Sequence, residues 1–236
     1  PQRDMCDLAA CYVLSTYLLD AFTVTGYLWP TGERGSGKTQ FLTLVSELGF
    51  LGVLLQMGGS FASLRDLSDY GATLCFDDAE HLSDQKTDPD KRALLLAGNR
   101  KGMVVTVKEP TPDRGWQMRS VRTFTPRCFA AIRTPDPVLA SRAILLPLVR
   151  TSDKERANAD ALAYSKWPHN RAALIDDLWA LGCANVGKMA WYEEQVCAAA
   201  PLLGRSLEPW RTLLSVAMWV DECAVTQVGN LRHNLY

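Results

Sequence analysis

Apolar residues change their spacing along this chain of 236 residues. From residue 23 to residue 148, short runs rich in β-branched and aromatic residues alternate with stretches in which apolar residues recur every three or four positions. Runs of the first kind are typical of strands, and stretches of the second kind are typical of helices. The expected strands are residues 23–29, 50–56, 72–76, 128–132 and 143–148, and the expected helices among them are residues 38–48, 61–70 and 89–97. This alternation predicts an α/β fold, with helices on both faces of a parallel sheet.

Both ends of the chain and one internal stretch depart from this alternation. Residues 103–108 and 118–124 are strand-like and flank a tip with Pro110, Pro112 and Gly115, which indicates a β-hairpin inserted into the core. Helical spacing appears at residues 7–22 and near residues 156–164, 171–181, 188–200 and 207–225. We therefore expect an N-terminal helical buttress at 1–23, an α/β core at 24–150 with the hairpin at about 103–124, and a helical lid at 151–236.

A glycine-rich run joins the first expected strand to the helix at 38–48. Residues 32–39 read G-E-R-G-S-G-K-T and match every position of the phosphate-binding loop pattern G-x-x-x-x-G-K-[ST]. In such a loop, backbone N–H groups surround the β-phosphate, Lys38 reaches the β- and γ-phosphate oxygens, and the Thr39 hydroxyl ligates Mg²⁺. The expected nucleotide-binding residues of the loop are Gly32, Arg34, Gly35, Ser36, Gly37, Lys38 and Thr39. The sequence predicts an ATP-binding P-loop ATPase, and the alternative is a glycine-rich turn that matches by chance.

Two aspartates end the expected strand at 72–76. Residues 74–80 read L-C-F-D-D-A-E and resemble a Walker B motif, in which an apolar strand brings carboxylates to the nucleotide-binding edge of the sheet. We expect Asp77 to hold Mg²⁺ together with Thr39. Asp78 is expected to orient the attacking water, with Glu80 as the second candidate for that role. The alternative is an acidic turn that caps the next helix.

The composition and charge of the chain indicate which kinds of molecule it could bind. Hydrophobic residues make up 47% and charged residues 22% of the chain, as in globular proteins, and the net charge of −1 argues against a protein that coats nucleic acid with its whole surface. Residues 91–133 nevertheless carry ten basic residues against two acidic ones, an excess of eight positive charges that could hold a polyanion. The seven cysteines form no C-x-x-C pair and there are three histidines, so neither a disulfide framework nor a zinc site is indicated.

The lengths of the apolar stretches indicate whether the chain could span a membrane. The longest apolar stretches, residues 8–19 and 50–55, are too short to span a bilayer, and the start of the chain shows no signal peptide. We expect a soluble, cytoplasmic protein with no membrane partner. Because the chain begins at Pro1 and has Met5 inside it, we also expect it to be a piece of a longer polypeptide.

The order of these motifs resembles that of a known family. The phosphate-binding loop, the acidic strand end and the run L-L-L-A-G-N-R-K-G at 94–102 resemble the AAA+ ATPases of the superfamily-three helicases, and the D-D-A run at 77–79 resembles the Walker B motif of the papillomavirus replicative helicase. The span from about 18 to 150, with G-R-S-L-E-P-W-R at 204–211, is most similar to an uncharacterised ATPase family of primase-helicase proteins in phages, plasmids and other mobile elements. The resemblance implies a hexameric ring whose hairpins track DNA in a central channel.

The resemblance also implies a DNA-binding role for the hairpin. Cations there would meet phosphates, and an aromatic ring would stack on or wedge against a base. The residues concerned are Lys108, Arg114, Trp116 and Arg119. The alternative is a solvated basic hairpin with Trp116 folded back onto the core.

Two further arginines gain roles from the resemblance. Arg142 would be an arginine finger that stabilises charge at the γ-phosphate of a neighbouring subunit, and the alternative is a surface arginine at a helix end. Arg205 would open the last long helix and bind nucleotide as a sensor of the γ-phosphate, and the alternative is a surface residue at a helix start. Where the family places a sensor asparagine, this chain has Arg133 and Thr134, so that role stays open.

Three functions compete at this point. The first is ATP hydrolysis coupled to DNA translocation or unwinding in the replication of a mobile element or phage, by a ring with ATP sites between subunits. The protein would then be encoded by a bacterium, a phage or a plasmid. Its expected partners are single-stranded DNA, further copies of the chain and a fused or associated primase. The second is a regulatory or loader AAA+ ATPase that uses ATP-driven assembly to recruit a partner to DNA. The third is a P-loop kinase of small substrates.

Overall fold

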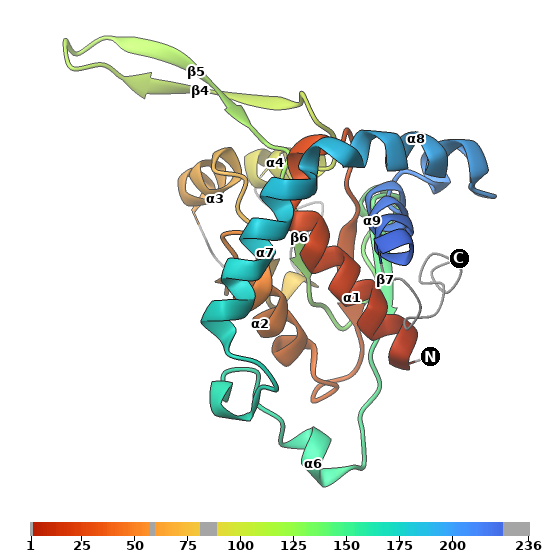
Figure 1. The fold of residues 1–236 in the computed structure, drawn as a ribbon. Helices are drawn as coiled ribbons and strands as arrows, with labels where there is room; N and C mark the ends of the chain where they lie inside the picture. The colour runs from red at the N-terminus through yellow and green to blue at the C-terminus, as the bar shows by residue number, and fades with distance from the viewer. Residues whose placement is uncertain (1, 57–59, 81–88, 224–236) are drawn as a thin grey trace.

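The computed structural model describes residues 2–56, 60–80 and 89–223, and its centre is a five-stranded parallel sheet (Figure 1). The strands are β1 (Tyr27–Thr31), β2 (Val53–Leu55), β3 (Leu74–Phe76), β6 (Arg127–Phe129) and β7 (Ala143–Pro147), in the spatial order β2-β3-β6-β1-β7. Neighbouring strands pair in parallel throughout this sheet. The predicted α/β class with a parallel sheet is confirmed.

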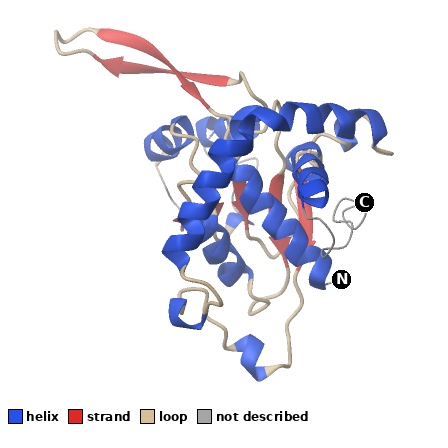
Figure 2. Cartoon of the chain, viewed as in Figure 1, coloured by secondary structure: helices blue, strands red, loops and turns tan. Residues whose placement is uncertain are grey.

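Helices cover the sheet and fill the last third of the chain (Figure 2). The helices are α1 (Gln2–Tyr17), α2 (Lys38–Leu48), α3 (Phe61–Asp69), α4 (Pro89–Ala97), α5 (Pro137–Ala140), α6 (Lys154–Ala157), α7 (Arg171–Asn185), α8 (Met189–Ala199) and α9 (Arg211–Cys223). Single turns of 3-10 helix lie at η1 (Leu19–Ala21), η3 (Tyr164–Lys166), η4 (Val186–Lys188) and η5 (Gly204–Ser206). Among the described residues, no helix is long and apolar enough to cross a membrane.

The two faces of the sheet belong to separate apolar clusters. On β1, the buried side chains of Tyr27 and Trp29 join the cluster under α3 and α4, whereas Leu28 joins the cluster under α1, α2 and α9. This alternation follows from the two-residue repeat of a strand. Because both faces bury side chains, β1 reads as a continuous apolar run rather than as an alternating one.

A second, two-stranded sheet projects from the body as a hairpin (Figure 1). Its strands are β4 (Val104–Pro110) and β5 (Trp116–Arg122), close to the expected bounds. Their antiparallel register pairs Lys108 with Met118 and Pro110 with Trp116, so these four side chains share one face. Arg119 lies on the opposite face, where it pairs with Val107.

A buried arginine joins the root of this hairpin to the sheet. Arg127, at the start of β6, is fully buried. Its guanidinium donates to the carbonyl oxygens of Leu94 at 3.0 Å and Leu95 at 2.7 Å, at the end of α4. It also donates to the carbonyl oxygen of Thr123, just after β5, at 2.9 Å. A Cβ on Gly98 would overlap this guanidinium, so the chain needs glycine where it passes from α4 toward the hairpin.

Several expected boundaries are wrong for identifiable reasons. The first strand was expected at 23–29 with Pro30 as a break, but β1 runs from Tyr27 to Thr31 and includes Pro30. Residues 23–26 are held elsewhere, because Thr25 donates its N–H to the Asn99 carbonyl and the Thr23 carbonyl accepts the Lys101 N–H.

The helices near the ends also differ from expectation. The helix expected near 156–164 ends at Ala157, and the exposed residues that follow form turns and η3. The helix expected from 207 begins at Arg211, two residues after Pro209, and α1 covers residues 2–17 rather than 7–22. The division into buttress, core and lid stays a prediction.

Candidate nucleotide-binding site

The glycine-rich loop lies where β1 ends and α2 begins. Gly32, Gly35 and Gly37 all have positive φ angles, of 154°, 76° and 91°, and Gly37 is the N-cap of α2. Glycine adopts positive φ angles without a steric penalty because it has no Cβ atom. Where right-handed and left-handed backbone conformations alternate, successive N–H groups point toward the same side. The unpaired N–H groups at the start of α2 lie at the same place, so the loop is suited to bind an anion.

Three predicted residues meet beside this loop. The Lys38 ammonium donates to the carbonyl oxygens of Gly32 at 2.6 Å and Glu33 at 2.9 Å. The Thr39 hydroxyl donates to the Asp77 carboxylate at 3.0 Å, so a side chain of α2 meets the residue that follows β3. Hydroxyl and carboxylate oxygens are suitable ligands for Mg²⁺, and a hydroxyl–carboxylate pair beside a cationic loop fits a magnesium nucleotide.

The remaining acidic residues of this strand end have different surroundings. Asp78 is exposed and has a φ of 54°, which is uncommon for a residue with a Cβ and is found at functional sites. Its backbone N–H is held by the Asp77 carboxylate at 3.1 Å. Glu80 accepts the Ile132 N–H at 2.6 Å and so joins the ends of β3 and β6. Asp78 therefore has the freer carboxylate for a role in catalysis.

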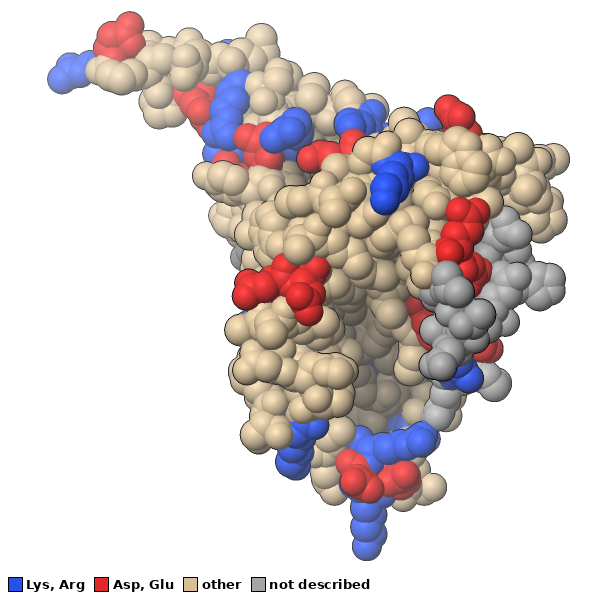
Figure 3. All heavy atoms as spheres, in the orientation of Figure 1, with Lys and Arg blue, Asp and Glu red and all other residues tan. Residues whose placement is uncertain are grey.

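An apolar cavity of about 760 Å³ adjoins the loop. Its walls come from α1, α2, the segment after β7 and α7, including Leu14, Phe41, Leu148 and Leu178. The Ser36 hydroxyl of the loop also lines it and is buried, with no hydrogen-bond partner among the residues that the structure describes. Figure 3 shows the face that carries α1 and α7, which is hollowed between them. A cavity of this size and character accommodates a planar organic group next to the phosphate-binding loop.

Arg142 lies at the far edge of the sheet from its own loop. The register pairs Ala143 with Tyr27 and Pro147 with Thr31, so Arg142 precedes the amino end of β7 while the loop follows the carboxyl end of β1. The separation is roughly 16 Å of strand, at about 3.3 Å per residue. The Arg142 side chain donates to the Val138 carbonyl at 2.6 Å and to the Asn99 side chain at 3.2 Å. Arg142 therefore lies too far from the loop of its own subunit to contact a phosphate bound there.

The structure places Arg205 away from the phosphate-binding loop of its own subunit, and its role as a sensor of the γ-phosphate stays a prediction. Arg205 lies in η5, before α9 begins, rather than at the start of the last long helix. The neighbouring Pro209 packs so closely on Gly26 that a Cβ there would overlap its carbonyl oxygen, and the Thr212 hydroxyl donates to the Val24 carbonyl. These contacts place this segment at the amino edge of β1, opposite the loop.

A different arginine lies beside the loop. The Arg150 guanidinium is 3.3 Å, at Nη2, from the position that a Cβ on Gly35 would take. Sequence reasoning missed Arg150. Its signal was position: it follows the strand expected at 143–148, and carboxyl ends of parallel strands face the ligand in such sheets. Arg133 and Thr134 are exposed residues after β6, and the Arg133 carbonyl accepts the Trp29 indole N–H at 3.0 Å.

The hairpin residues divide into two groups. Trp116 is 70% exposed and Met118 is 73% exposed, on the face that also carries Lys108, so Trp116 is not folded back onto the core. Lys108 and Arg114 have no ion pair with any described residue, and Arg114, with a φ of 62°, lies at the tip. This face offers an aromatic surface, a flexible thioether and free cations.

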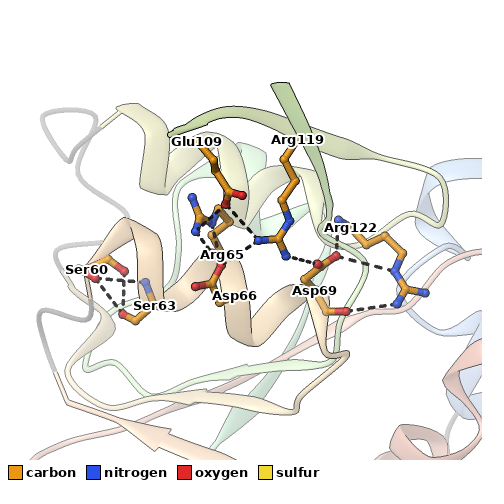
Figure 4. A network of polar contacts seen from close by, with 8 residues as sticks. All are labelled: Ser60, Ser63, Arg65, Asp66, Asp69, Glu109, Arg119 and Arg122. Carbon is orange, nitrogen blue, oxygen red and sulfur yellow. Dashed lines mark hydrogen bonds and ion pairs between the residues drawn. The ribbon is translucent and has the colours of Figure 1, made fainter. Parts of the chain in front are cut away.

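Arg119 instead anchors the hairpin to α3 (Figure 4). Its guanidinium contacts the Asp69 carboxylate at 2.7 Å and the Glu109 carboxylate at 3.0 Å. Arg65 of α3 contacts the same Glu109 at 3.3 Å, and Asp69 also accepts the Arg122 N–H at 3.0 Å. Burial raises the pKa of Asp69, but the Arg122 N–H and the Arg119 guanidinium outweigh it, so the pKa lies below its usual range.

These contacts change the meaning of the basic excess at 91–133. Six of its ten basic side chains are already committed within the described chain, and one of the six is Lys101, which donates to the Asp20 carbonyl at 2.6 Å. Arg127 is buried, and the other four arginines are in ion pairs: Arg92 with Asp136, Arg100 with Glu208, Arg119 with Asp69 and Glu109, and Arg122 with Asp69. The cations that remain free on the hairpin are therefore few and lie toward its outer half.

Among solved structures, the chain is similar to one described as SCCmec type IV Cch, an active helicase, with a TM-score of 0.57 and 14% sequence identity. The similarity covers 96% of this chain and 46% of that one, so this chain spans about half the length of the helicase chain. No protein-family model and no curated protein matches the sequence. The likeness shows a helicase-like α/β fold.

Proposed function

We propose that this chain is a Mg²⁺-dependent ATPase of the helicase type. The observation that carries the proposal is the 3.0 Å contact between the Thr39 hydroxyl and the Asp77 carboxylate, beside a loop with three positive-φ glycines. These oxygens suit Mg²⁺, and the N–H groups of the loop suit phosphate. The apolar cavity next to Ser36 suits the adenine base.

In this proposal the residues of the site divide the work of phosphoryl transfer. Bound Mg²⁺ would neutralise charge on the β- and γ-phosphates. Lys38 would leave the loop carbonyls and bind the same phosphates, and Asp78 would orient the attacking water. Arg142 would stabilise the charge that develops on the γ-phosphate of a neighbouring subunit, since it lies at the opposite edge from its own loop.

This placement of Arg142 favours a ring. In such a ring, the sheet edge that carries the phosphate-binding loop in one copy meets the sheet edge that carries Arg142 in the next copy. This is a head-to-tail contact, and repeated head-to-tail contacts close into a ring when the rotation between neighbouring subunits allows it. We propose a hexamer of this kind, in line with the resemblance to superfamily-three helicases. ATP sites would then lie between subunits and respond to assembly.

The exposed face of the hairpin supports DNA as the polymer on which the ring acts. Trp116 can stack on a base, and Lys108 and Arg114 can meet flanking phosphates. We propose single-stranded DNA as the partner, translocation or unwinding during replication of a phage or mobile element as the process, and a primase as a fused or associated activity. Arg119 contributes indirectly, because it fixes the hairpin to α3.

The test combines ATP hydrolysis, with and without oligothymidylate, and molecular mass in the presence of ATP and Mg²⁺. The wild type should assemble and hydrolyse ATP faster with DNA. Lys38→Ala should lose ATP binding, whereas Arg142→Ala should bind ATP and hydrolyse it roughly a thousandfold more slowly. Lys154→Ala, an exposed change on α6, is the control. A wild type that neither assembles nor responds to DNA would refute the helicase function. Assembly without strand displacement would instead favour a loader.

A further inference from the structure

The segment after β7 runs directly along the phosphate-binding loop. The Leu148 N–H donates to the Thr31 carbonyl at 2.7 Å, which continues the pairing of β7 with β1 beyond the last strand residue. A Cβ on Gly32 would overlap the Leu148 carbonyl oxygen, so the two backbones approach as closely as glycine allows. Leu148 is therefore held beside the loop by backbone contacts, and Arg150 follows two residues later.

Arg150 extends this segment over the middle of the loop. Its Nη2, Nε and Cζ atoms lie 3.3, 3.4 and 3.5 Å from the position of a Cβ on Gly35. These similar distances place the planar group against Gly35, at a point where the φ of 76° already favours glycine. Any side chain at residue 35 would crowd the guanidinium.

The Arg150 guanidinium is also uncommitted. It is exposed, and among the described residues no carboxylate or carbonyl accepts from it. Arginine presents five N–H donors in a planar fork that matches phosphate oxygens. By contrast, Arg142 and Arg205 lie at the opposite edge of the sheet, so neither supplies a cation to the loop of its own subunit.

The location indicates which part of a nucleotide Arg150 would meet. Leu148 and Val149, just before it, line the apolar cavity together with Ser36. Arg150 thus follows the cavity wall and lies against the loop, which is where a nucleotide passes from its base to its phosphates. The α- and β-phosphates are common to ATP and ADP.

We propose that Arg150 is a phosphate-binding residue of the same subunit, which binds the α- and β-phosphates of the nucleotide and fixes it between loop and cavity. This inference rests on the proposed ATPase function. Because ADP carries the same two phosphates, Arg150 contributes to ground-state binding of substrate and product alike. Its removal should raise KM and leave kcat nearly unchanged.

The test measures affinities for ATP, ADP and adenosine with Mg²⁺ by calorimetry, for the wild type, Arg150→Met and Arg150→Lys. Charge-assisted hydrogen bonds from an exposed side chain predict about tenfold weaker binding of both ATP and ADP by Arg150→Met. Adenosine affinity should not change, and Arg150→Lys should recover part of the loss. Lys154→Met removes one exposed cation four residues later and should change none of the three affinities.

Each contrary result has a distinct meaning. Equal ATP and ADP affinities in the wild type and Arg150→Met would overturn the role of Arg150 and leave the proposed ATPase intact. Parallel loss of adenosine binding would show that Arg150 supports the cavity rather than the phosphates, which also overturns the proposal. A wild type that binds neither nucleotide would overturn both the ATPase and this inference.

Discussion

Replacing the buried Arg127 by methionine should destabilise the protein and loosen the hairpin from the sheet. The guanidinium holds the carbonyl oxygens of Leu94, Leu95 and Thr123 from inside the core. Methionine has a similar length and no donor. In the Arg127→Met variant, the Leu95 carbonyl would keep the Tyr27 hydroxyl, which donates to it at 2.6 Å.

The expected size of the effect follows from the two carbonyls that lose this donor. A buried acceptor left without a partner costs about 1–3 kcal/mol, and removing the desolvated charge offsets part of the sum. We therefore expect a loss of about 3 kcal/mol in the free energy of unfolding. With an unfolding entropy of about 2.1 cal/mol/K per residue, a chain of this length should melt about 6 °C lower.

Thermal melts and urea titrations followed by tryptophan fluorescence would measure this loss. Arg133→Met, which removes an exposed cation a few residues away, is the matched control and should melt within about 1 °C of the wild type. Hydrogen exchange should also become faster in β4 and β5 of Arg127→Met. A decrease below about 2 °C would show that the hydrogen bonds of Arg127 do no more than offset its own desolvation.

Two further predictions concern the hairpin and acid stability. Trp116→Ala should weaken binding of oligothymidylate about tenfold, because stacking on one base contributes about 1–3 kcal/mol. Arg119→Met should weaken that binding less, because Arg119 lies on the opposite face of the hairpin. A titration in which Arg119→Met loses more affinity than Trp116→Ala would contradict the proposal that the face with Trp116 binds DNA. Burial raises the pKa of Asp136, but Arg92 and α5 N–H groups outweigh it and hold that pKa low. The melting temperature of the wild type should therefore fall as the pH drops below about 4. The melting temperature of Asp136→Asn should fall less steeply over the same pH range.

Local sequence signals were sufficient for much of the fold. The bounds of α2 and α4 match the expected helices to the residue, and the hairpin strands match within three residues at each end. Residues that begin or end regular structure lie at the ends of these elements: glycine before α2, proline at the start of α4, and prolines with glycine at the hairpin tip. The contact between Thr39 and Asp77 was also foreseeable, since both follow from motifs placed at the same edge of a parallel sheet.

Pairing across long sequence distances was not foreseeable in the same way. Arg119 reads as a free cation until α3 places Asp69 beside it, 50 residues earlier in the chain. Arg205 reads as the start of a helix that could reach the nucleotide, but Pro209 holds that segment at Gly26. The position of Arg150 depends on the register between β7 and β1, and the sequence does not fix that register.

The close fit between Gly98 and Arg127 also constrains how this chain can change over time. A Cβ at 98 and a guanidinium at 127 occupy the same space, so the first substitution tolerated in this pair is the loss of the arginine. An alignment of relatives should show one-way covariation: glycine at 98 beside any residue at 127, and larger residues at 98 only where 127 is short. Lineages that have passed through that exchange would regain the arginine only after restoring the glycine.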